Sequence, residues 1–126
     1  MELDIKFDEA VDTEWEKLKH KESQYIIFKV SDDQTTVLLE KVGERVAEDD
    51  EDRDKKNWEN FVNDMPKDAP RWAIFDLHLV KEDGATANKM IFIHYSPDAY
   101  FGSDKFFFAT AKDNVAHHFV GINKSV

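Results

Sequence analysis

Apolar residues recur along the chain with two spacings, one typical of helices and one typical of strands. In residues 8–20, Val11, Trp15 and Leu18 fall on one helical face, which predicts a helix. Asp8 is available as its N-terminal cap, and the residues before it are expected to form a short tail.

Four short runs have the composition of strands. The β-branched and aromatic residues of 23–30 and 35–42 flank a polar turn, which predicts an antiparallel hairpin. The run 71–80 alternates apolar residues on two faces, and 89–96 is again strand-like. Residues 81–88, which contain an Asp-Gly pair, are expected to form a long loop between these two strands.

Two further segments have helical spacing. The segment 55–66 ends at a proline and is expected to pack one face on the sheet. From Ser103 onward apolar residues follow at four-residue intervals, and Gly121 is expected to stop that longer helix. The apolar positions of the first helix are Trp58, Phe61, Val62 and Met65, and those of the second are Ala111, Val115 and Phe119.

This order of elements predicts one domain over residues 1–126 with an α+β fold. The expected architecture is a mixed, largely antiparallel central sheet with helices covering its faces.

Charge and composition exclude several functions. The net charge of −10 opposes nucleic-acid binding, and no apolar window is long enough to span a membrane. The N-terminus has no signal-peptide pattern, so we expect a cytoplasmic or nuclear protein. The chain has no cysteine, which removes disulfides and thiol chemistry.

Candidate catalytic and metal-binding groups fail their spacing tests. The acidic run Glu48–Asp54 lacks the residue order and the glycine of a calcium loop, so it is interpreted as a solvated loop. His117 and His118 are adjacent and point about 100° apart on a helix, so they cannot share a metal ion. Ser96-Pro97-Asp98 lacks the glycines of a nucleophile turn and reads as a strand terminator. We therefore expect no cofactor, no metal and no enzymatic activity.

The long helix favours a binding function. Phe106, Phe107 and Phe108 span most of its circumference, so they cannot all face one sheet. At least one of them is expected near a contact surface.

Three blocks of the chain resemble the ADF/cofilin family of actin-binding proteins. They are "WENFVNDMPKDAPRWAIFDL", "KMIFIHYSPD" and "DKFFFATAKDNVAHHFVGI", and the resemblance covers residues 4–122. It implies the actin-depolymerising factor homology fold, a mixed sheet of about five strands between helices. It also implies a monomeric protein that binds actin monomers and filaments and promotes filament turnover without being an enzyme. The actin contacts it implies are Leu3, Asp4, Lys89, Lys105, Phe106, Lys112, Asp113, His117 and Ile122.

Several positions depart from the family pattern. Ser103, Ala116 and His117 stand where the family has basic residues, and Ala87 replaces one of the filament-side pair. The final strand and helix of the family are expected to be reduced or missing. These departures predict actin-monomer binding with weak filament severing. With histidines in place of fixed charges, affinity is expected to rise as the pH falls toward about 6.

Two alternatives remain open at this point. The chain could bind the actin-related branch complex, as glia-maturation-factor-like proteins do. It could instead be a non-actin interaction module that uses the acidic residues 48–54 to bind a basic partner.

Overall fold

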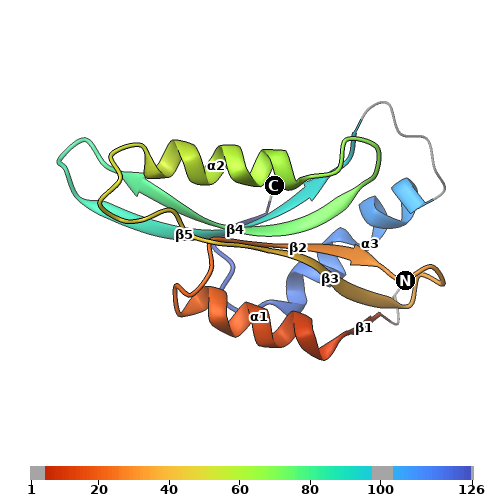
Figure 1. The fold of residues 1–126 in the computed structure, drawn as a ribbon. Coiled ribbons are helices and arrows are strands. Elements are labelled where there is room, and N and C mark those ends of the chain that lie inside the picture. Colours follow the sequence, from red (N-terminus) through yellow and green to blue (C-terminus); the bar gives the residue numbers. More distant parts are fainter. Residues whose placement is uncertain (1–4, 98–103, 126) are drawn as a thin grey trace.

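The computed structural model describes residues 5–97 and 104–125, which form three helices and one six-stranded sheet (Figure 1). The elements in chain order are β1 (Lys6–Phe7), α1 (Glu9–Lys19), β2 (Tyr25–Val30), β3 (Thr36–Gly43), α2 (Arg53–Asp64), β4 (Arg71–Val80), β5 (Thr86–Tyr95), α3 (Asp104–His118) and β6 (Lys124–Ser125).

The sheet has the order β1-β3-β2-β4-β5-β6. Its four long strands pair antiparallel, while β1 pairs parallel with β3 and β6 pairs parallel with β5. This confirms the mixed sheet and the α+β class. The predicted N-terminal tail is wrong within the described residues, because Lys6–Phe7 forms the short edge strand β1.

Helices cover both faces of the sheet, with α1 and α3 on one face and α2 on the other (Figure 1). The alternation predicted along β4 is confirmed. Trp72 and Ile74 are buried in the core under α1 and α3, whereas Ala73 and Phe75 are buried in a second cluster under α2. Each residue step along this strand therefore changes the layer that its side chain joins.

The predicted helices exist, but some of their details differ. Asp8 occupies the N-cap position of α1, yet its side chain makes no capping hydrogen bond. In α2 the prediction of one apolar face is partly wrong, since Trp58 and Val62 are 46% and 51% exposed. Asn57 is buried instead, and its Oδ1 accepts a hydrogen bond from the Val46 amide at 2.9 Å. The polar contact explains why an asparagine faces inward here.

The turn between β4 and β5 is shorter than predicted. Pairing continues to the last rung, Val80 with Thr86, so residues 86–88 belong to β5 and not to the loop. Gly84 has a φ of +87°, a conformation that glycine adopts readily, and it closes the turn.

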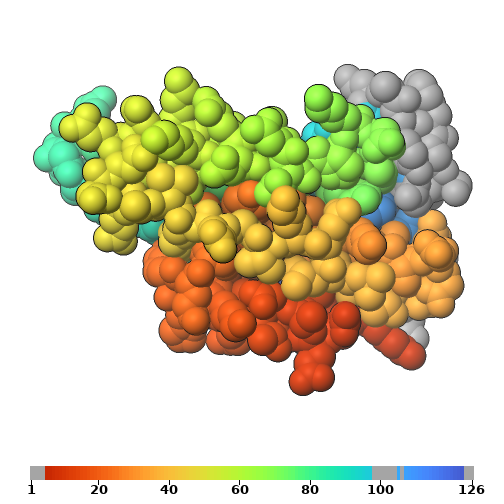
Figure 2. Space-filling view, viewed as in Figure 1, coloured from red at the N-terminus to blue at the C-terminus, as the bar shows by residue number. Residues whose placement is uncertain are grey.

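The acidic run is mostly exposed, as predicted for a solvated loop, but its end is structured. Asp54 already belongs to α2, and its carboxylate lies 2.8 Å from His78 Nδ1 on β4. Lys56 Nζ donates to Asp50 at 2.5 Å. The loop after β3 and the beginning of α2 thus lie at the same end of the molecule as the β4–β5 hairpin tip (yellow and teal in Figure 2).

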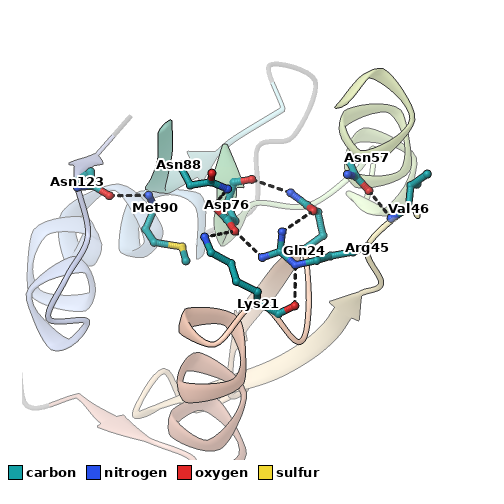
Figure 3. A network of polar contacts seen from close by, with 9 residues as sticks. All are labelled: Lys21, Gln24, Arg45, Val46, Asn57, Asp76, Asn88, Met90 and Asn123. Atoms are coloured by element: carbon teal, nitrogen blue, oxygen red, sulfur yellow. Dashed lines mark hydrogen bonds and ion pairs between the residues drawn. The ribbon is translucent and has the colours of Figure 1, made fainter. Parts of the chain in front are cut away.

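A buried carboxylate joins two strands and two loops in the middle of the fold (Figure 3). The side chain of Asp76 on β4 has no exposed surface. Its Oδ2 accepts hydrogen bonds from Lys21 Nζ at 2.8 Å and from the Arg45 guanidinium, and its Oδ1 accepts from Asn88 Nδ2 at 3.2 Å. Burial alone would raise the pKa of Asp76, but the bonds from Lys21, Arg45 and Asn88 outweigh it and lower that pKa below its usual value. Asp76 is therefore ionised and paired in the folded state.

Candidate functional site

One row of buried side chains packs α3 and the residue after it against the sheet. Phe108, Ala111, Val115 and Phe119 are almost fully buried, at the spacing predicted from the sequence. Trp72 on β4 donates its indole N–H to the backbone oxygen of Phe108 at 3.2 Å, and its ring lies 4.2 Å from that of Phe108. This contact fixes the first half of the helix against the sheet.

The opposite side of α3 is open to solvent. Thr110, Asp113, Asn114 and His117 are all exposed. Because three- and four-residue steps return to the same side of a helix, these positions form one continuous row. A surface hollow of about 330 Å³ at the end of this row brings together three of the predicted contacts, Asp113, His117 and Ile122.

The segment after α3 is held to β5 by a clasp of two hydrogen bonds between Asn123 and Met90, which the sequence did not reveal. Asn123 N donates to Met90 O at 2.8 Å, and Met90 N donates to Asn123 Oδ1 at 2.7 Å. Gly121 has a φ of +111°, which lets the chain turn from the helix toward β5. The clasp therefore fixes Ile122 between the end of α3 and the sheet.

Two predicted lysines lie along one flank of α3. Lys105 is partly buried, and its Nζ donates to Pro97 O at 3.1 Å. The ammonium group thus bonds to the corner where β5 ends, after Tyr95, as predicted for a strand terminator. Asp98 of that corner lies outside the described residues. Lys112 follows two turns later and is also partly buried.

Lys112 lies close to a histidine under the helix. His94 on β5 has a buried Nε2 that finds no hydrogen-bond partner within residues 5–97 and 104–125. Burial and, to a lesser degree, the charge of Lys112 lower the pKa of His94 below its usual 6.5. His94 is therefore neutral at physiological pH.

We expect His94 to make the protein less stable in mild acid. Above about pH 6.5 the imidazole is neutral in both states, so its full contribution to stability is present. As the pH falls, the unfolded chain binds the proton first, and that contribution is lost as the pH approaches the lower folded pKa. Urea unfolding at several pH values from about 7.5 to about 5 should show a shallower loss of stability for His94→Gln than for the unaltered protein. The exposed His117→Gln is the control, and equal slopes for all three proteins would contradict the expectation.

The two adjacent histidines face different directions, as the helical geometry predicted. His118 Nε2 lies 2.5 Å from Asp12 Oδ1 on α1, and its ring stacks on Phe7 at 3.6 Å. His117 points to the exposed row. Among residues 5–97 and 104–125, no three His, Asp or Glu side chains are grouped as metal ligands.

The remaining predicted contacts do not join this cluster. Lys89 pairs across the sheet with Leu77, which packs on the α2 side, so Lys89 lies on the face opposite α3. Leu3 and Asp4 lie outside the described residues, as does the side chain of Phe106. The structure therefore assembles Lys105, Lys112, Asp113, His117 and Ile122 along α3 and separates Lys89 from them.

The chain is similar in sequence to proteins of a known family. The family described as cofilin/tropomyosin-type actin-binding protein matches residues 4–126. Actin-depolymerizing factor 7 of Oryza sativa subsp. japonica is 32% identical over 99 residues, which are 79% of this chain and 65% of that protein. The chain thus spans just under two thirds of that relative's length.

Solved structures agree with the sequence comparison. Cofilin of Streptomyces griseoflavus superposes with a TM-score of 0.78 at 28% identity, covering 97% of this chain and 83% of the other. Actin depolymerization factor 2 of Plasmodium berghei shares the fold, with a TM-score of 0.82 at 21% identity and coverage of 99% and 85%. No described helix is long and apolar enough to cross a membrane. With its sequence and its fold both matching, the chain belongs to the ADF/cofilin family of actin-binding proteins.

Proposed function

We propose that this protein binds actin monomers through α3 and the residues that follow it. The observation that carries the proposal is the exposed row Thr110, Asp113, Asn114 and His117, which ends in the hollow beside Ile122. The buried row on the other side holds the helix rigidly, so the exposed row can be presented to a partner with little loss of conformational freedom.

Filament binding would need a second contact away from α3. Lys89 supports such a contact because it is exposed on the opposite sheet face and cannot share the α3 interface. The α3 surface carries only two lysines, both partly buried, which is consistent with weak severing of filaments. The expected rise of affinity in mild acid would depend on His117, since His118 is already paired with Asp12.

The direct test measures binding to fluorescently labelled actin monomers in the ADP and ATP states, together with cosedimentation with filaments. We expect saturable monomer binding and a smaller effect on filament length. Failure to bind either monomer form would refute the proposal. A parallel titration with the actin-related branch complex separates the branch-binding alternative, which predicts tighter binding to that complex than to monomers.

A further inference from the structure

The α2 side of the sheet carries an apolar surface that is only partly covered. Within the described residues α2 is the one helix on this face (Figure 1). Trp58 and Val62, one turn apart on α2, are 46% and 51% exposed. Several side chains of β4 and β5 on the same face are also partly exposed. We call the following six residues the α2-side strip: Trp58, Val62, Leu77, Ile91, Ile93 and Tyr95.

Buried side chains beneath the α2-side strip hold it in position. The Trp58 ring meets Phe75 edge to face at 5.2 Å, and Phe75 pairs across the sheet with Ile91. Ile93 and Tyr95 pack against the buried cluster that contains Phe61 and Met65. A crevice of about 70 Å³ opens beside Trp58 and Leu77. The strip is therefore preformed and includes a partly exposed aromatic ring, which is typical of binding surfaces.

Negative charge borders one end of the strip. Between Glu48 and Glu59 there are seven acidic and three basic residues. Lys56 is occupied by Asp50, and Arg53 donates to the backbone oxygen of Glu48. The carboxylates of Asp49, Glu51 and Asp52 are in exposed residues with no ion pair among the described residues. The bordering surface thus carries an excess of unpaired acidic groups.

We propose that the α2-side strip binds an amphipathic, basic helix of another protein. The apolar face of such a helix would cover Trp58, Val62 and the exposed side chains of β5, and its lysines or arginines would lie over the acidic residues before α2. The strip and α3 lie on opposite faces of the sheet, so this partner and an actin monomer bound at α3 could be held at the same time. The proposal does not depend on actin binding.

The test uses a fluorescein-labelled helical peptide of sixteen leucines and lysines, with the leucines on one face, and a scrambled peptide of the same composition. We expect the amphipathic peptide to raise the fluorescence anisotropy with saturation at micromolar concentration. Trp58→Ala and Val62→Asp should each weaken binding by about tenfold or more. Val120→Asp is the matched control, because Val120 is 82% exposed at the end of α3. Binding of labelled actin monomers by Trp58→Ala and Val62→Asp should be unchanged.

Four results would overturn the proposal. Equal binding of the scrambled peptide, or binding insensitive to both strip variants, would reduce the effect to general charge attraction. Absence of binding at about 100 µM peptide would remove it altogether. Concentration-dependent self-association that Val62→Asp abolishes would show that a second copy of this chain covers the strip. Val62→Asp alters an exposed position, so it keeps the test valid even where Trp58→Ala affects folding.

Discussion

Replacing Asp76 with alanine is expected to lower the free energy of unfolding by about 3 kcal/mol. The carboxylate is fully buried and receives hydrogen bonds from Lys21, Arg45 and Asn88. Its removal would leave the Arg45 guanidinium without its counter-charge. The effect falls at the lower end of the range for broken buried ion pairs, because the Lys21 side chain is 49% exposed and can be hydrated instead.

Urea unfolding at neutral pH measures this loss, and Asp49→Ala is the matched control. Asp49 is exposed in the loop before α2, so its replacement should change stability by less than about 0.5 kcal/mol. Asp76→Asn keeps the shape of the side chain and should fall between the two. A loss below about 1 kcal/mol for Asp76→Ala would mean that the network contributes little to the fold.

Reversing the charge of Lys112 is expected to weaken binding of actin monomers by about thirtyfold, or about 2 kcal/mol. This prediction rests on the proposed function. Lys112 lies partly exposed on the flank of the exposed row of α3, where its side chain can reach a bound partner. A glutamate there would replace attraction to the acidic surface of actin by repulsion.

The measurement is a titration of labelled ADP-actin with Lys112→Glu, alongside Lys55→Glu. Lys55 is 76% exposed on α2, on the other side of the sheet, so its reversal changes net charge equally without touching α3. Thermal unfolding of both variants checks that they remain folded. Similar affinities for the two variants would place the actin contact elsewhere or reduce it to net charge.

The elements predicted correctly are those whose signal is local. The two-residue alternation of 71–80 and the four-residue spacing of Ala111, Val115 and Phe119 are visible within one element. By contrast, β1 and β6 each contain two residues, and their hydrogen bonds are made to strands about thirty residues away along the chain. Nothing in their own sequence distinguishes them from tails.

The prediction of one apolar face for α2 was partly wrong because the deciding contact is made to a distant segment of the chain. Periodicity alone groups Trp58 and Val62 with Phe61 and Met65, and it cannot see that the Val46 amide needs an acceptor. Asn57 faces inward and accepts this hydrogen bond, while its neighbour Trp58 and the residue one turn later, Val62, are partly exposed. A buried polar contact between distant segments thus overrides a local apolar pattern.

The candidate site was predictable only in part. Positions on α3 could be inferred from helix geometry and the family resemblance, and Asp113, His117 and Ile122 do line one hollow. The bond from Lys105 to Pro97 O and the clasp between Asn123 and Met90 depend on tertiary contacts, which no sequence motif indicates. Lys89 shows why proximity along the chain misleads, since it is adjacent to Met90 yet faces the other layer.

The indole of Trp72 has a practical consequence for spectroscopy. Each of the three tryptophans reports on a different helix: Trp15 lies in α1 and meets Phe119, Trp58 lies in α2, and Trp72 on β4 is hydrogen-bonded to α3. Their environments also differ, because Trp15 and Trp72 are at most 5% exposed while Trp58 is 46% exposed. Variants that retain one indole each would let emission wavelength and quenching follow the three helices separately. The fluorescence of the three tryptophans would thus show, without an added dye, which helix separates from the sheet first during unfolding.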